Sequence, residues 1–359
     1  KMKQSVEEKH ILNSMIYGSE IQKKQYLICK KILNYKNKKG VNLNLNLGDS
    51  LGFDFWGKKF DVVIGNPPYQ EAMVDGTRKA KNHNLWEKFI LKGLEHTKNN
   101  GYLVFIVPTS WMSPAWKYME ETFKAYRIHH LEINTIQDYF PGVGSQFSWF
   151  ILEKKKPKKG FKTKIVSKFN GEKYEVDFDF NDIKFFSTLL SKESISIVKK
   201  YYNLKSKKFN FTADSFLHSS NKKAFLSKEK NDEFCHPIKH TSSRSLFASI
   251  EHPVQKRKKI LVTKSGKFIP EFDSGIYGVS EATMYSLVKT DKEGKNKSKI
   301  LESKISKFIF TICKWSGFNI QKVFQDLPYF ILEDYSDEEI YKKFKLTKKE
   351  IKQIEKVIK

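Results

Sequence analysis

The chain has 359 residues, of which 39% are hydrophobic and 14% aromatic, values typical of a folded protein and unlike those of a disordered one. It carries 66 Lys and Arg against 40 Asp and Glu, a formal net charge of +26. No run of 18 apolar residues occurs, which argues against a membrane-spanning helix. Cys29, Cys235 and Cys313 share no metal-ligand spacing. These features predict a reduced, cytoplasmic protein without a bound metal.

The basic excess favours a polyanionic partner, because each phosphate that a protein neutralises releases condensed counterions. The basic residues are 62 Lys and only 4 Arg, and Asn, Ile and Phe are also common, as A+T-rich coding would produce. Such a codon bias would raise Asp and Glu too, so it does not account for the net excess. The charge therefore predicts a nucleic-acid partner.

Helices and strands alternate through the first part of the chain. Segments 15–20 and 101–108 are apolar runs typical of buried strands, whereas segment 41–47 alternates strictly as VNLNLNL. Alternation at this spacing predicts a parallel α/β sheet with crossover helices. In chain order we expect helix 5–14, strand 15–20, helix 22–34, strands 41–47 and 60–65, helix 82–98, strand 101–108, helix 113–126, and strands 128–136 and 146–153.

After a basic linker at 154–160 the pattern becomes less regular. Segment 256–288 predicts strands joined by glycine-containing turns. Near the end, Ser336 with Glu339 and Thr347 with Glu350 have the spacing of capping boxes, each before a short amphipathic helix.

The tetrapeptide Asn66-Pro67-Pro68-Tyr69 directly follows strand 60–65. Methylating an exocyclic amine requires acceptors that hold its two N–H groups, because the nitrogen lone pair is delocalised into the ring. The Asn66 amide oxygen and the Pro67 carbonyl can supply them, and the prolines fix φ so that these acceptors are positioned in advance. Tyr69 offers a face on which a flipped base can stack, worth roughly 1–3 kcal/mol. A plain tight turn is the alternative, but the strands on either side favour the catalytic interpretation.

With these strands, the motif resembles the N6-adenine DNA methyltransferases of the gamma arrangement, in particular the methylase part of Eco57I-like restriction–modification proteins. The likeness covers residues 5–153 well and 211–359 more loosely. It implies an α/β fold class: a Rossmann-like S-adenosylmethionine-dependent methyltransferase domain at 1–156, a mixed α+β target-recognition domain at 157–335, and a helical tail at 336–359. It also implies S-adenosylmethionine as cofactor, double-stranded DNA as partner, and a bacterial or viral-host cytoplasm.

The resemblance also assigns the residues that hold the adenosine part of the cofactor. Glu20, the acid that ends strand 15–20, is assigned to the ribose hydroxyls with Ile21 beside it, as carboxylates act in dinucleotide sites. Asp49 and Ser50, in the turn after strand 41–47, are assigned to the adenine amino group.

Two further contacts follow from the same resemblance. Asn66 is expected to contact the cofactor as well as the target base. Phe147, in strand 146–153, stands where the family places a second aromatic residue against the flipped base, although a simple core position is equally compatible with the sequence.

The family pattern begins with a strand and a glycine-rich turn of the D-P-A-C-G-S-G kind, which residues 1–14 lack. Only glycine permits the close backbone approach to the cofactor that this turn makes. The missing strand should lie centrally, between strands 15–20 and 60–65, and its absence would leave two unpaired edges. We therefore expect a fragment, a cleaved form or half of a split enzyme, with another chain or an upstream segment supplying the loop.

The sequence Pro141-Gly142-Val143-Gly144-Ser145 resembles such a glycine-rich loop, as a circularly permuted enzyme would have it. A cofactor loop should lead into a helix, whereas this one leads into strand 146–153. We therefore do not assign it to the cofactor.

The second half of the chain is expected to recognise the target sequence. Basic residues interleaved with aromatic ones suit contacts with the DNA backbone and stacking. A solvated loop in a lysine-rich protein is the alternative for any single lysine. The expected DNA-binding residues are Arg244, Lys256, Arg257, Lys258, Lys264 and Lys267.

Three other functions remain open. The acceptor could be an RNA base, cytosine N4 or a protein glutamine, since related enzymes use the same loop on similar amino groups. The chain could also be a non-catalytic DNA-binding subunit without the cofactor loop. The sequence gives no support for a nuclease.

Overall fold

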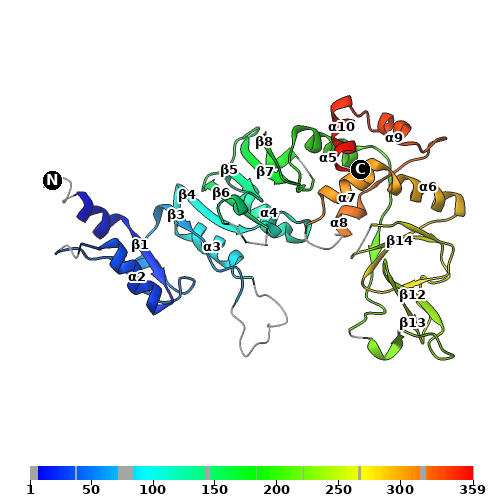
Figure 1. Cartoon of the computed structure of the whole chain (residues 1–359), viewed down its shortest axis with the longest axis horizontal. Coiled ribbons are helices and arrows are strands. Elements are labelled where there is room, and N and C mark those ends of the chain that lie inside the picture. The colour runs from blue at the N-terminus through cyan, green and yellow to red at the C-terminus, as the bar shows by residue number, and fades with distance from the viewer. Residues whose placement is uncertain are drawn as a thin grey trace. The chain divides into compact units, whose positions relative to one another are not determined.

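The computed structural model describes residues 7–36, 39–71, 84–140, 142, 146–182, 184–220, 222–265, 268–315 and 321–358. The chain divides into two compact units. Unit 1 consists of Lys1–Val107 and Trp149–Lys156, and unit 2 of Pro108–Ser148 and Pro157–Lys359. Figure 1 labels the elements of both.

Unit 1 begins with a helical stretch that ends in a π-helical turn, Ile11–Met15, followed by β1 (Tyr17–Glu20), α2 (Lys23–Leu33) and β2 (Asn44–Leu47). The first two strands pair in parallel, from Tyr17 opposite Asn44 to Glu20 opposite Leu47. The expected helix 22–34 and strand 41–47 are thus present in slightly shorter form. The prediction that segment 15–20 is a buried strand is wrong, because Met15 still belongs to the helical turn and no residue of β1 is buried.

The next strands of unit 1 are β3 (Phe60–Gly65) and β4 (Thr97–Pro108), which pair in parallel. Helix α3 (Trp86–His96) lies between them in sequence and packs closely on β4, since a Cβ added to Gly93 would lie 2.7 Å from the Leu103 side chain. The predicted strand 60–65 is confirmed. The expected strand 101–108 is the second part of β4, but it is buried on one face only, with Leu103 and Phe105 inside.

Strand β6 (Phe147–Glu153) runs antiparallel to β4, because Thr109 N–H donates to Gln146 O and Lys154 N–H donates to Gly101 O. Beyond its end, the Lys154 ammonium donates to the carbonyls of Leu94 and Thr97, at 2.6 and 2.9 Å. These contacts satisfy carbonyls at the carboxyl end of α3. The start of the expected basic linker 154–160 therefore stabilises the preceding domain.

In unit 2, β5 (Arg127–Ile133) pairs in parallel with β7 (Thr163–Phe169), and β7 forms an antiparallel hairpin with β8 (Glu172–Phe178). The hydrogen-bonded strand order of this sheet is β3-β4-β6-β5-β7-β8. Helix α4 (Lys117–Lys124) covers only part of the expected helix 113–126, because a 3₁₀ turn occupies Pro114–Trp116. The expected strands 128–136 and 146–153 correspond to β5 and β6.

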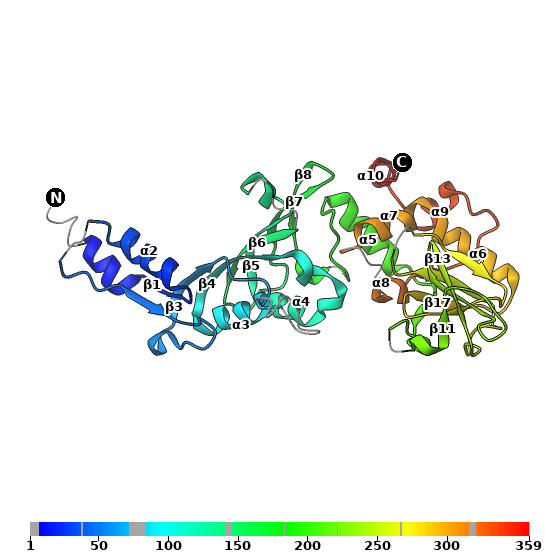
Figure 2. The same ribbon diagram turned by 60° about the horizontal axis from the view of Figure 1, so that its bottom comes forward.

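The rest of unit 2 contains a large helical core that the sequence pattern did not predict. Buried side chains from α5, α7 and α9, such as Ile197, Tyr201, Phe308 and Ile340, form one hydrophobic cluster. Figure 2 shows α5, α7 and α9 close together beside the strands of this unit. The helices are α5 (Lys192–Asn203), α6 (Asp291–Glu302), α7 (Lys304–Ile312), α8 (Gln321–Gln325), α9 (Asp337–Lys343) and α10 (Lys348–Val357).

Two four-stranded sheets and one two-stranded ribbon accompany these helices. Their orders are β10-β17-β14-β15, β11-β13-β12-β16 and β18-β9. The prediction of strands and glycine turns in 256–288 is confirmed by β14 to β17. The strands are β9 (Lys207–Lys208), β10 (Thr212–Ala213), β11 (Leu226–Ser227), β12 (His236–Thr241), β13 (Arg244–Ala248), β14 (Lys259–Thr263), β15 (Glu271–Asp273), β16 (Gly278–Val279), β17 (Thr283–Leu287) and β18 (Pro328–Tyr329).

One of the two expected capping boxes forms. Thr347 caps α10, and Glu350 returns a contact to the Thr347 N–H. The box expected at Ser336 is wrong, although Ser336 does precede α9, because its hydroxyl donates to the Asp334 carboxylate at 2.5 Å. Its intended partner Glu339 binds the Lys342 ammonium at 2.6 Å.

Candidate functional site

The Asn66–Tyr69 motif leaves the carboxyl end of β3 as an extended loop in unit 1. Asn66 is exposed, Pro67 is buried and Tyr69 is half-buried. The Tyr69 hydroxyl donates to the Asn66 side-chain oxygen at 2.5 Å. Burial raises the pKa of Tyr69, so the phenol keeps its proton and remains a donor. The hydrogen bond orients the Asn66 amide and leaves one lone pair of its oxygen for another donor.

A second set of contacts fixes the far end of the motif. The Tyr69 carbonyl accepts from Leu85 N–H at 3.0 Å, and Gln70 forms an isolated antiparallel bridge with Asn84. Because Leu85 is the N-cap residue of α3, the motif is held between the end of β3 and the start of α3. Sequence reasoning missed Asn84 and Leu85, because nothing in their local pattern indicates pairing with the loop.

The proposed cofactor acids lie at one edge of the β1–β2 sheet. Since the two strands are parallel, Glu20 and the turn after β2 share the same carboxyl end. Gly48 N–H donates to Glu20 O at 3.1 Å, and the Ser50 hydroxyl donates to Ser19 O at 3.4 Å. The structure therefore brings Glu20 together with Asp49 and Ser50, as expected.

Each acid also shapes its own turn. Glu20 accepts from Gln22 N–H at 2.7 Å, and Asp49 accepts from Leu51 N–H at 3.0 Å. Both carboxylates keep oxygen lone pairs beyond these bonds. Ile21, which was expected beside Glu20, is exposed. This edge can therefore accept hydrogen bonds from hydroxyl or amino groups of a ligand.

Phe147 belongs to unit 2 and is only 9% exposed, at the first position of β6. Its carbonyl accepts from Asn134 N–H at 2.9 Å. Its assignment to a target base therefore stays a prediction. The glycine-rich segment Pro141–Ser145 lies outside the described residues except for Gly142.

The basic residues expected to bind DNA are less available than their sequence suggests. Lys256 pairs with Glu251 and Lys258 with Asp291, each at 2.6 Å. Arg244 and Arg257 are exposed, Lys264 is half-buried, and Lys267 lies outside the described residues. The structure thus leaves the two arginines as the exposed candidates for base contacts, and their role remains a prediction.

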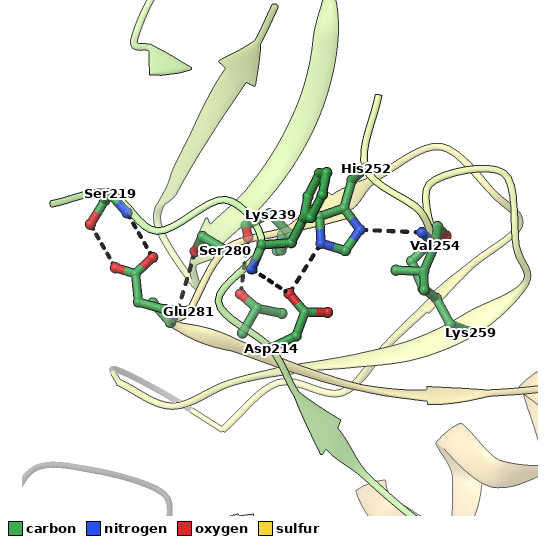
Figure 3. A network of polar contacts seen from close by, with 11 residues as sticks. Asp214, Ser219, Lys239, His252, Val254, Lys259, Ser280 and Glu281 are labelled. Carbon is green, nitrogen blue, oxygen red and sulfur yellow. Dashed lines mark hydrogen bonds and ion pairs between the residues drawn. The ribbon is translucent and has the colours of Figure 1, made fainter. Parts of the chain in front are cut away.

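The neighbouring Lys259 is fully buried and forms an ion pair with Asp273 at 2.5 Å. Its ammonium also donates to the carbonyls of Val254, Gln255 and Arg257. Figure 3 shows Lys259 and Val254 beside His252, whose ring contacts Asp214 at 3.2 Å. These polar groups satisfy one another inside unit 2, which indicates a structural role.

A third basic region was not singled out by sequence reasoning. Lys207, Lys208 and Lys289 line a cavity of about 670 Å³ in unit 2. No sequence signal distinguishes them in a chain with so many lysines. Only the folding of distant segments gathers them.

Two further site types were considered. Among the described residues, no group of three or more His, Cys, Asp or Glu side chains is placed to hold a metal ion. The helices that the structure describes include none with the length and hydropathy needed to cross a membrane.

Residues 11–142 match a family model described as the Eco57I restriction-modification methylase. This segment contains β1, β2, β3 and the Asn66–Tyr69 motif. The resemblance drawn from the motif and its strands is therefore confirmed over this part of the chain.

Two curated proteins are similar to the same part of the chain. Modification methylase CviBIII of Paramecium bursaria Chlorella virus NC1A is 34% identical over 101 residues, which cover 26% of this chain and 25% of that protein. An uncharacterized adenine-specific methylase of Mycoplasma pneumoniae is 30% identical over 113 residues, covering 28% of this chain and 26% of that protein. The match spans about a quarter of the length of these relatives.

Two solved structures resemble most of the chain. The Type IIL restriction-modification enzyme MmeI in complex with DNA has a TM-score of 0.50 and 11% identity, covering 88% of this chain and 54% of that one. The DrdV–DNA complex has a TM-score of 0.51 and 11% identity, covering 91% and 50%. With the family match, this likeness confirms the expected α/β methyltransferase fold class.

Proposed function

We propose that this chain is the catalytic and target-recognition part of a DNA methyltransferase that methylates adenine N6 within a restriction–modification system. The observation that carries the proposal is the exposed Asn66 amide oxygen, oriented by Tyr69 at the end of β3. The family match over residues 11–142 and the adenine-specific relative support it.

The chain's own groups would act on the target amine as follows. The free lone pair of Asn66 Oδ1 and the Pro67 carbonyl accept the two N–H groups of the amine, which localises the nitrogen lone pair for attack. The ring of Tyr69 stacks on the base, and the base must leave the duplex to reach this loop. The Tyr69–Asn66 hydrogen bond is formed before any base arrives, so no reorganisation of that amide is needed.

S-adenosylmethionine is the cofactor expected of this fold, and when bound it supplies the methyl group on a sulfonium. The acceptor-rich edge formed by Glu20 and Asp49 fits the hydroxyl and amino groups of an adenosine. Glu20 would hold the ribose hydroxyls, and Asp49 with Ser50 would hold the adenine. No described residue of β1 to β3 is assigned to the methionine end.

We also propose that another polypeptide segment, upstream in the same gene product or on a separate chain, completes unit 1. Within the described residues, β1 pairs only with β2, and β3 pairs only with β4. Val62 and Ile64 of β3 are 54% and 77% exposed, although parallel strands are normally covered on both faces. A strand paired between β1 and β3 would use both free edges and could carry the glycine-rich turn.

The partner of unit 2 is proposed to be double-stranded DNA. The net charge of +26 supports a polyanionic partner, and the similar structures of MmeI and DrdV are DNA complexes. Base readout is assigned provisionally to the exposed Arg244 and Arg257, since arginine makes the bidentate contact with guanine.

The test is nucleoside mass spectrometry of unmethylated plasmid DNA after incubation with S-adenosylmethionine and either this chain or the full product of its gene. We expect N6-methyladenine with the full product. Replacing Asn66 by Ala should lower the rate about 100- to 1000-fold, the usual cost of losing one preorganised polar group. Asn99→Ala, an exposed residue of β4, is the matched control and should leave the rate unchanged.

Other outcomes separate the alternatives. N4-methylcytosine would move the acceptor to cytosine. A labelled RNA or protein, with no methylated base in DNA, would replace DNA by that acceptor. DNA binding without methyl transfer to any acceptor would leave a binding subunit and overturn the enzymatic proposal.

A further inference from the structure

The cavity of about 670 Å³ in unit 2 has a strongly basic lining. It is formed by the β9–β18 ribbon, strands β10 and β17, and the start of α6. Its volume falls within the range of ordinary ligand sites. Four lysines line it against one acid, Glu293, and the lysines are Lys207, Lys208, Lys289 and Lys297.

One of these lysines is already neutralised. The Lys297 ammonium is 3.2 Å from Glu293 Oε1 and lies over the rings of Phe209 and Tyr329, at 5.4 and 5.0 Å from their centroids. The other oxygen of Glu293 accepts from Lys289 N–H at 2.8 Å. The single acid of the lining is therefore fully engaged.

The remaining three ammonium groups have no acidic partner within hydrogen-bonding distance among the described residues. Lys207 and Lys208 come from β9, and Lys289 comes from the segment between β17 and α6. Burial lowers the pKa of Lys208, although Asp326 opposes the shift, which shows that its charge is incompletely solvated. An anion in the cavity would compensate these charges.

The rest of the lining suits a phosphate with an attached sugar. Thr212, Thr290 and Asn210 bring hydroxyl and amide groups, and Tyr285 and Tyr329 bring aromatic rings. By contrast, Lys256 and Lys258 in the basic run expected to bind DNA are paired with acids, and Lys259 is buried.

We propose that this cavity binds a backbone phosphate of a DNA strand through Lys207, Lys208 and Lys289, and that it is the main anion-binding site of unit 2. The inference rests on the proposed DNA partner and deepens it by giving the site of contact. It places the electrostatic contact at residues more than 45 positions from the basic run at 256–259 in one direction and 30 in the other.

The experiment measures binding of a fluorescent DNA duplex by the full gene product at several salt concentrations. The triple variant K207Q/K208Q/K289Q should bind at least about tenfold more weakly and lower the slope of log affinity against log salt by about 2. The matched control K256Q removes an exposed but paired lysine and should change neither value appreciably.

A neutral variant separates occupancy of the cavity from general charge. Thr212→Trp adds a ring at an exposed position of β10 that lines the cavity, and tryptophan is well tolerated in strands. We expect weaker DNA binding with the protein charge unchanged. Circular dichroism and the unfolding midpoint of each variant verify folding.

The outcomes distinguish the two levels of the argument. Wild-type binding with an unaffected triple variant overturns the cavity and leaves the DNA partner intact. Absence of wild-type binding at low salt overturns both. Adenosine monophosphate or inorganic phosphate is titrated by calorimetry in parallel. Binding of either that is lost in the triple variant, with unchanged DNA affinity, would assign the cavity to a free phosphate compound and overturn the DNA source.

Discussion

The beginning of unit 1 and the helical core of unit 2 use apolar side chains in opposite ways. Helix α2 and strands β1, β2 and β3 contain no buried residue. In α7, six of nine residues are buried, including Ile305, Phe308 and Ile309. Both regions have amphipathic or apolar sequences. The difference shows that an apolar face predicts burial only when the structure also contains the element that covers it.

The energetic consequence follows from the exposed faces. Burying one large apolar side chain contributes roughly 1.5–3 kcal/mol. The exposed residues of the first region make little of this contribution, and they are Met15, Ile21, Leu27, Ile32, Val62 and Ile64. We therefore expect the β1–β3 region to open far more readily than the core of unit 2.

Hydrogen exchange gives the largest expected contrast. Amides of β1, β2 and β3 should exchange at least about 1000-fold faster than those of α7 and β14, because local opening of the first region exposes little additional apolar surface. Exchange followed by mass spectrometry measures this directly. Equal protection in both regions would contradict the comparison. In the full gene product, a strand that pairs with β1 and β3 should raise protection there and leave α7 unchanged.

The buried ion pair of unit 2 should show the largest effect of a single substitution. Asp273→Asn leaves the Lys259 ammonium inside the protein without its counter-charge, which typically costs about 3–5 kcal/mol. Urea unfolding monitored by circular dichroism measures the loss. Glu251→Gln, which removes the partner of the exposed Lys256, is the control and should cost less than about 1 kcal/mol.

If Asp273→Asn costs no more than the control, Lys259 does not depend on its carboxylate, and the three backbone carbonyls suffice. The double variant K259M/D273L sharpens this result. Replacing a buried pair by apolar residues of similar volume is often close to neutral. A near-normal midpoint for the double variant would show that the pair is not needed for folding.

A smaller contrast comes from equivalent isoleucines in the two regions. Ile309→Ala in α7 removes a fully buried side chain and should cost about 2–5 kcal/mol. Ile64→Ala in β3 removes a mostly exposed one and should change stability by less than about 0.5 kcal/mol in this chain. Denaturant titration of both variants, followed by fluorescence, makes the comparison. A large cost for Ile64→Ala would show that the β3 face is already covered.

The same contrast explains which parts of the fold the sequence could predict. Strand 60–65 and helix 22–34 are local patterns, and both occur within one residue of their expected bounds. Helix α6 was not predicted because its buried positions include Gly294 and Lys297 beside Ile300 and Leu301, so its pattern is not apolar. Gly294 is required there, since a Cβ would lie 2.3 Å from the Phe272 ring.

The candidate site divides in the same way. Asn66 to Tyr69 are contiguous, so their chemistry is visible in sequence. The parallel pairing that joins Glu20 to Asp49 followed from the expected strands and the family resemblance. The burial of Lys259 depends on the register of β14 with β15, which places it opposite Asp273. No local pattern gives that register, so the basic run looked more available than it is.

Cysteine reactivity tests the comparison with the smallest perturbation. Cys29 lies exposed on α2, Cys235 is exposed in unit 2, and Cys313 is buried beside the core. Burial raises the pKa of Cys313 to about 12. At pH 8 its thiolate fraction is then roughly 1 in 10,000, and only the thiolate reacts. We expect two thiols to react rapidly with a disulfide reagent and the third only after denaturation, as measured by absorbance and peptide mapping. A slow Cys29 would mean that α2 is covered in solution, for instance by a second copy of the chain, and would weaken the contrast between the regions. If Cys29 reacts quickly in this chain but slowly in the full gene product, while Cys235 stays fast in both, the covering element is supplied by the rest of that product.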